Sequence, residues 1–409
     1  MKHYRTSKQN TAGIIRYSCG ILFMLFSFFY LFCIQGEILA EAEYVYSKGL
    51  NSYHLLMGAI IITVILQLIQ WVTNKLSQLP ANWHALSYIP SALLLAILTD
   101  INREAIMHFS FGQWVWIAPL IILGYVLLVI IVRSLHSSNE ETVMTVNSQI
   151  FQDFIILFVL MLVVGWIPAS TDVYHYELKA ERLIMEKDYE GAARVGESSL
   201  RTSARLTQLR MYALSKTGQL PERIFEYPQY DGSVGLLDVT DTIPTYRFSP
   251  QNICFHLGAL CGPSVHSTDR FYKLVLSDSI RNQHTIDYYL CSLLLDKKLN
   301  QFRKELEYYY FQKDSVDREI TRLPKAYSEA LLLIGERSAA SEGRIMVHHK
   351  LFATLTDKEI VERFNAYNKL KEEWPNRTER INKAHREFGD TYWWYYDFSH
   401  IAKGELQQH

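Results

Sequence analysis

The chain has 409 residues, of which 49% are hydrophobic and 20% charged, and its mean hydropathy is −0.02. Its 41 basic and 42 acidic residues give a formal net charge of −1, which excludes the basic footprint of a nucleic-acid-binding protein. Most of the long apolar runs lie in residues 13–168, whereas residues 169–409 are rich in Lys, Arg, Glu and Tyr. The sequence therefore predicts an integral membrane protein in two parts, a transmembrane domain (1–168) and a helical domain (169–409).

About five segments of the first part are long and apolar enough to be read as membrane spans, because about 20 apolar residues cross the hydrocarbon core. They cover residues 13–35, 54–72, 83–99, 114–132 and 150–168. Four of them lack the polar face that a soluble helix shows. The third is short and contains Pro90, so it could also be re-entrant.

Basic residues predict the orientation, since they are retained on the cytoplasmic side. The N-terminal tail carries Lys2, Arg5, Lys8 and Arg16 without an acidic residue, so we expect it in the cytoplasm. Five crossings then place residues 169–409 outside the cytoplasm; a re-entrant third segment would place them inside. Ala40-Glu41-Ala42 resembles a signal-peptidase site, but cleavage there is the less favoured alternative.

Polar residues in the spans indicate an anchor more than a transporter. The ionisable residues lie near span ends, where side chains reach the headgroup region; they are Arg16, Asp100, Arg133 and Asp153. Gln67 and Gln70 are the deepest polar groups, and interhelical hydrogen bonds are their favoured role over a substrate site.

Two helical hairpins are predicted at the start of the second part. Their turns, at Lys187-Asp188-Tyr189 and Gly218-Gln219-Leu220, are 31 residues apart, close to the period of about 34 in tetratricopeptide repeats. The run 188–192, Asp-Tyr-Glu-Gly-Ala, resembles the D-Y-x-x-A opening of that family's second helix, which should continue to Leu200 with Gly196 allowing close packing. The resemblance implies a tetratricopeptide-like (TPR-like) α-solenoid, with an unrelated helical hairpin as the alternative. The fold class is therefore predicted as all-α.

Further helices are expected after an irregular segment, 231–250. They cover residues 250–260, 268–276, 285–295, 299–311, 324–335 and 357–373, and a last one begins near Asn376. The spans together with the runs 174–180, 323–331 and 388–396 are similar to an uncharacterised family of Bacteroidota membrane proteins. That resemblance implies a bacterial inner membrane and a periplasmic second domain, but no activity.

No catalytic, cofactor or metal motif stands out. A Walker loop, a G-x-S-x-G elbow and a dinucleotide fingerprint are all missing, and the neighbouring His348 and His349 lack a zinc spacing. Enzymatic activity is thus the less favoured reading. Cys254 and Cys261 would stand about 10 Å apart on one helix, beyond disulfide reach. Free buried thiols are favoured, with a bridge from Cys291 to either as the alternative in an oxidising compartment.

Aromatic residues are the candidates for partner binding or packing. The run 392–396, Tyr-Trp-Trp-Tyr-Tyr, covers every side of its helix. Its favoured role is to pack the last helix as a cap; the alternatives are carbohydrate stacking and a position at the membrane surface. The six candidate residues are Tyr176, Tyr189, Tyr212, Trp393, Trp394 and Tyr396.

The sequence supports two hypotheses for the function. The first is a membrane-anchored scaffold whose helical surface binds a protein or peptide partner, as repeat solenoids do. The alternative is a multi-pass protein that handles a lipid-linked envelope substrate, as a transferase or transport accessory. In either case membrane lipid is a partner, and no cofactor, metal or nucleic acid is expected.

Overall fold

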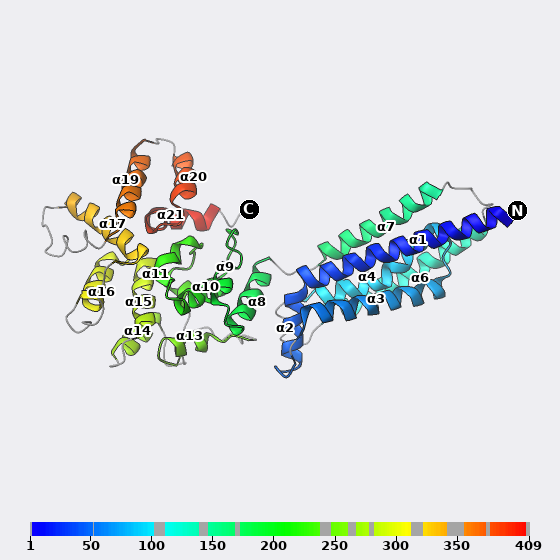
Figure 1. Cartoon of the computed structure of the whole chain (residues 1–409), viewed down its shortest axis with the longest axis horizontal. Coiled ribbons are helices and arrows are strands. Elements are labelled where there is room, and N and C mark those ends of the chain that lie inside the picture. The colour runs from blue at the N-terminus through cyan, green and yellow to red at the C-terminus, as the bar shows by residue number, and fades with distance from the viewer. Residues whose placement is uncertain are drawn as a thin grey trace. The chain divides into compact units, whose positions relative to one another are not determined.

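The structure is a computed structural model that describes residues 2–51, 53–101, 111–138, 146–167, 172–237, 247–260, 267–277, 282–311, 322–341, 356–373 and 377–405. All regular secondary structure within these ranges is helical, which confirms the all-α prediction. The chain divides into two compact units, Met1–His175 and Tyr176–His409 (Figure 1).

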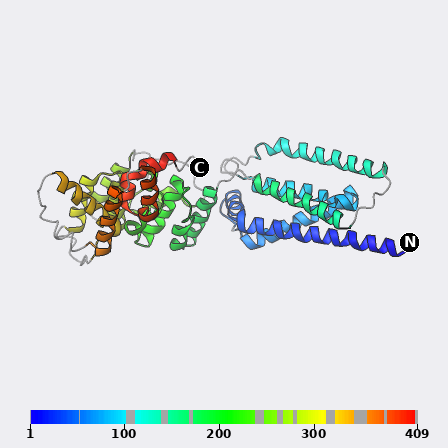
Figure 2. The ribbon, with the colours of Figure 1, turned by 90° about the horizontal axis from the view of Figure 1, so that it is seen from above.

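The first unit is a bundle of apolar helices. In chain order it contains α1 (Lys2–Phe29), the π-turn η1 (Tyr30–Ile34), α2 (Gly36–Tyr46), α3 (Leu55–Ser77), the 3₁₀ segment η2 (Ala81–Tyr88), α4 (Ile89–Thr99), α6 (Trp114–Ser138) and α7 (Val146–Trp166). Figure 2 shows the long helices of this unit running along one common direction.

Three helices in the described residues are long and apolar enough to cross a membrane, so the prediction of five spans is wrong. They are Arg16–Ile34, Leu55–Ser77 and Trp114–Leu135. The third predicted span fails because residues 83–88 belong to the 3₁₀ segment and α4 begins only at Ile89. Pro90 fits only the first turn of a helix, and the 11 residues of α4 rise about 16 Å, half the hydrocarbon thickness. The fifth, Ile150–Trp166, is a shorter apolar helix.

The three long helices expose their apolar side chains. Within the most apolar 18-residue stretch of each helix, only 28%, 22% and 11%, respectively, is buried inside the protein. Leu68 of α3 and Leu120 of α6 are examples, each more than half exposed, and Phe158 of the shorter helix α7 is exposed to a similar degree. A soluble protein would not leave this much apolar surface in water, so lipid is the solvent that this unit requires.

Side-chain amides join the helices of the bundle. Gln67 donates to the Gly20 carbonyl oxygen over 3.0 Å, and Gln70 donates to the Ser87 hydroxyl over 2.9 Å. Both contacts cross between elements, so the favoured role of interhelical hydrogen bonding is confirmed. Asp153 departs from expectation: it is fully buried against η2 and is not exposed at the surface of the bundle.

The second unit is built from shorter helices. They are α8 (Asp172–Met185), α9 (Tyr189–Arg194), α10 (Ala204–Lys216), α11 (Leu220–Arg223), η3 (Ile224–Glu226), α12 (Gly232–Leu236), α13 (Pro250–His256), α14 (Thr268–Ser277), α15 (Gln283–Leu295), α16 (Leu299–Phe311), α17 (Lys325–Ser341), α19 (Lys358–Glu373), α20 (Arg377–Phe388) and α21 (Tyr392–Glu405). The predicted starts and ends of α14, α15, α16 and α19 are confirmed to within two residues.

The first hairpin differs from its prediction in its second helix. Asp188 caps α9, since its carboxylate accepts the Gly191 N–H over 2.9 Å. The helix then ends at Arg194 instead of continuing to Leu200. Gly196 has φ +64°, the left-handed region that glycine tolerates and that terminates helices. Gly196 therefore stops the helix, and it also allows the close packing expected of it, because a Cβ there would lie within 3 Å of side-chain atoms of Arg210 and Tyr176.

Candidate functional site

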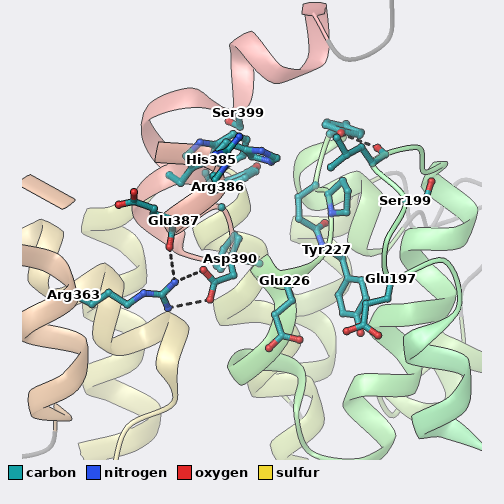
Figure 3. A pocket seen from close by; sticks show the side chains of 18 residues that line it. Glu197, Ser199, Glu226, Tyr227, Arg363, His385, Arg386, Glu387, Asp390 and Ser399 are labelled. Carbon is teal, nitrogen blue, oxygen red and sulfur yellow. Dashed lines mark hydrogen bonds and ion pairs between the residues drawn. The ribbon is translucent and has the colours of Figure 1, made fainter. Parts of the chain in front are cut away.

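The second unit contains a cleft of about 460 Å³ between its early and its late helices (Figure 3). One wall is formed by the segment after α9, by η3 and by residues 227–230; the other comes from α19, α20 and α21. Its lining residues are Glu197, Ser199, Leu200, Phe225, Glu226, Tyr227, Pro228, Gln229, Tyr230, Arg363, His385, Arg386, Glu387, Gly389, Asp390, Trp394, Tyr395 and Ser399.

The early wall depends on the stop at Gly196. A Cβ at this position would lie 2.8 Å from Nη2 of Arg210 and 2.9 Å from Cδ2 of Tyr176. Because this space is free, the fully buried Arg210 reaches the Val195 carbonyl oxygen with Nε (3.0 Å) and Nη2 (2.5 Å). Burial lowers the pKa of Arg210 to about 10, against the opposing effect of nearby groups that include Glu197. The next residue along the chain from Gly196, Glu197, lines the cleft.

The late wall is fixed by an ion cluster at the corner between α20 and α21. Asp390 accepts hydrogen bonds from both terminal nitrogens of Arg363, at 3.0 and 2.5 Å, and from Lys325 Nζ at 2.7 Å. Burial disfavours the Asp390 charge, but these two cations outweigh it and lower the pKa of the carboxyl group. Arg363 also donates to the Glu387 backbone oxygen over 3.0 Å, which ties α19 to the end of α20.

Behind this wall, Glu329 of α17 supports the start of α21. Its carboxyl group accepts the Tyr392 N–H over 2.7 Å, and its backbone oxygen accepts the Trp393 indole N–H over 2.8 Å. Burial raises the pKa of Glu329 to about 8. The start of α21, which carries the aromatic run 392–396, is therefore held by polar contacts with α17 as well as by packing.

Several aromatic side chains line the cleft. Trp394 packs against His385 with the ring planes tilted by 52° and the ring centroids 4.7 Å apart, and burial lowers the pKa of His385. Tyr227 and Tyr395 are buried below the surface and Tyr230 is half-buried. Such rings offer rigid apolar area at a low entropic cost, as in many binding sites.

Two charged residues of the cleft stand out because most of the others are paired within the protein. Glu226 pairs with Arg223 at 2.7 Å, and Asp390 pairs with Arg363 and Lys325. In the part of the chain that the structure describes, Glu197 and Arg386 form no ion pair, and both side chains are exposed. Figure 3 places them on opposite walls. The cleft thus presents one available carboxylate and one available guanidinium around an aromatic surface.

The six candidate residues from the sequence fall in different places. Trp394 is the one that lines the cleft; Trp393 is fully buried. Tyr189 and Tyr212 pack edge to face at 6.3 Å inside the first hairpins, and the half-buried Tyr176 lies beside Gly196. Tyr396 is half-buried, with the Arg337 guanidinium 5.2 Å and the Lys297 ammonium 5.4 Å from its ring centre.

The residues that sequence reasoning missed are the charged ones. Nothing in the local sequence marks Glu197 or Arg386, because each lies in an ordinary polar stretch and the two are 189 positions apart. The early break of α9 at Gly196 is the one local signal that could have pointed to Glu197. No group of three or more metal-ligating side chains occurs in the described ranges, and His348 and His349 lie outside them.

The cysteines differ from the favoured prediction. Cys254 is disulfide-bonded, whereas Cys291 is a free buried thiol. The expectation of a free Cys254, and the alternative of a bridge from Cys291, are both wrong. The reason is that α13 ends at His256 and the chain turns at Gly258 (φ +99°), so the two-turn helical separation does not apply. Cys261, the remaining cysteine of the sequence, lies outside the described residues.

Comparison with known proteins adds a family but no activity. A family model described as a family of unknown function, DUF6057, matches residues 104–261 and 262–399. No curated protein and no solved structure matches the chain. Because the two matched segments cover well over half of the sequence, including both walls of the cleft, the chain belongs to the DUF6057 family.

Proposed function

We propose that this protein is a membrane-anchored binding protein whose cleft takes an extended segment of a partner polypeptide. The observation that carries the proposal is the cleft itself: an aromatic surface flanked by the available charges of Glu197 and Arg386 on opposite walls. A peptide offers apolar side chains, a polar backbone and charges of both signs, and this combination fits such a surface.

The helical hairpins are consistent with that role. The Asp188 cap and the edge-to-face contact of Tyr189 with Tyr212 match what the tetratricopeptide resemblance implies for the first hairpin. We therefore extend the proposal to a TPR-like arrangement in the second unit, in which stacked hairpins supply the binding walls.

The proposed location is a bacterial inner membrane, with the second unit in the periplasm. The basic N-terminal tail supports a cytoplasmic N-terminus, and the three long helices alone make an odd number of crossings. The disulfide at Cys254 supports an oxidising compartment for the second unit. A C-terminal fusion to alkaline phosphatase should be active and a fusion to a cytoplasmic fluorescent reporter dark; the reverse result contradicts this location.

Site-specific crosslinking tests the binding role. A photoreactive phenylalanine replaces Leu200, which lines the cleft and is 47% exposed, in the full chain in intact cells. The matched control is Leu274 of α14, which is 54% exposed and does not line the cleft. We expect a discrete polypeptide adduct from position 200 and none from position 274. Equal adducts at both positions contradict the proposal. A lipid-linked saccharide adduct would favour the alternative function.

A further inference from the structure

Asp153 is the one ionisable residue of α7, and the structure places it inside the apolar bundle. Its side chain is 0% exposed and lies in the core shared by α1, η2 and α7, near Cys19 and Tyr88. An acidic group within an apolar bundle is costly and is retained where it has a role.

Only one of the two Asp153 oxygens is used by the protein. Oδ1 accepts the Ala85 N–H over 2.9 Å, and Oδ2 has no hydrogen-bond partner among the described residues. This N–H belongs to η2, where Trp83 departs from helical geometry (φ −125°, ψ 22°). Non-helical backbone within an apolar bundle needs such partners, so Asp153 helps hold η2 against α7.

No cation compensates Asp153 within the described part of the chain. The titratable groups that face it are Cys19 from α1 and Tyr88 from η2, with His84 next to Ala85. None of these is a fixed positive charge, and α4 carries no ionisable residue. Arg16 acts on His84, and no positive charge acts on Asp153.

These contacts decide between the two states of the carboxyl group. An ionised Asp153 would be an unpaired charge in an apolar core, which is far more costly than one unsatisfied hydroxyl. A neutral carboxylic acid keeps a carbonyl oxygen that can accept the Ala85 N–H. The neutral acid is therefore the form that the folded bundle stabilises.

We propose that Asp153 is a proton-binding site within the membrane unit, which holds η2 against α7 when protonated and releases it when the proton leaves. The proton exchanges with water at the membrane surface, and water then hydrates the carboxylate in place of the bundle. This inference is independent of the cleft and assigns the bundle a role beyond that of an anchor.

Infrared difference spectroscopy tests the protonation state in the full-length protein, reconstituted in lipid nanodiscs. Asp153→Asn is the matched variant, because its amide oxygen can still accept the Ala85 N–H while no proton can be bound or lost. Subtracting the variant spectrum from that of the unaltered protein at neutral pH should leave a protonated-carboxyl carbonyl band. Asp153→Ser serves for the same subtraction if the Asn variant does not fold. A difference that contains only carboxylate bands overturns the proposal.

Hydrogen exchange tests the coupling to η2. Exchange of the peptide that contains residues 81–88, corrected for the intrinsic effect of pH, should rise about tenfold or more between about pH 6 and pH 9 in the unaltered protein. In Asp153→Asn it should change less than about twofold over the same range. An equal rise in both proteins, or no rise in the unaltered one, shows that Asp153 does not control η2 and overturns the proposal.

Discussion

Glu329 predicts an unusual dependence of stability on pH. This residue is fully buried beneath α21, and burial raises its pKa from 4.5 to about 8, with the cations Lys325 and Arg363 opposing the effect. The folded protein therefore keeps a proton that the unfolded chain releases above about pH 4.5. The contribution of this group to the free energy of unfolding is full below pH 4.5 and decreases as pH rises to about 8.

The size of the effect follows from the same values. One pKa unit corresponds to about 1.4 kcal/mol, so ionising Glu329 in place should cost on the order of 3–5 kcal/mol at pH 9. Glu329→Gln removes the titration and keeps an oxygen that can accept the Tyr392 N–H. The variant should match the unaltered protein near pH 5 and unfold at a clearly higher denaturant concentration at pH 9.

Tryptophan fluorescence of the detergent-solubilised full chain is the assay, because Trp393 donates its indole N–H to the backbone oxygen of Glu329 and reports on this region. Urea titrations at pH 5, 7 and 9 compare the two proteins. A difference between them that stays constant with pH would show that Glu329 is ionised in the folded state and would refute the reasoning.

Three further perturbations follow from the second unit. Burial lowers the pKa of His256 to about 3, so stability should fall as pH drops below about 6.5, and it should fall less in His256→Asn. Thermal melts at pH 7 and pH 5 measure this loss, and an equal loss in the two proteins would contradict the prediction. Arg205→Ala should cost about 3–5 kcal/mol in urea titrations, because the buried Glu181 loses a partner at 2.7 Å, whereas a loss below about 1 kcal/mol would mean that water replaces it. Cys254→Ser should lower the unfolding free energy by about 2 kcal/mol, and a reductant should destabilise only the unaltered protein.

The helices that sequence reasoning located best have clear local signals. α16 matches its predicted range and α15 comes within two residues of its own, because turn residues and the Asn282 cap mark their limits. The first hairpin shows where such signals end. The pattern after Tyr189 remains helical in composition, yet a single left-handed glycine, Gly196, stops the helix six residues before the predicted end at Leu200.

The membrane unit was predicted in kind but not in detail. Apolar runs reveal where lipid-facing helices lie, but hydropathy does not distinguish α4 with its 3₁₀ lead-in from a full span. Asp153 looked like a headgroup residue because it stands near a span end, and only the packing of η2 against α7 shows it to be buried.

The cleft could not be predicted from sequence because its walls come from opposite ends of the second unit. Trp394 was a candidate on composition alone, whereas Glu197 and Arg386 become notable only when the fold brings them to one site without ion-pair partners among the described residues. Local patterns describe elements, but a site assembled across the chain depends on tertiary packing.

Charge reversal in the cleft, read by crosslinking from position 200, tests the central claim most directly. Glu197→Lys and Arg386→Glu are introduced separately into the full chain that carries the photoreactive residue, with Lys273→Glu on α14 as an exposed control. We predict that each cleft reversal reduces the polypeptide adduct about tenfold or more and that the control leaves it unchanged. An adduct that persists in both cleft variants would contradict a binding role for the cleft.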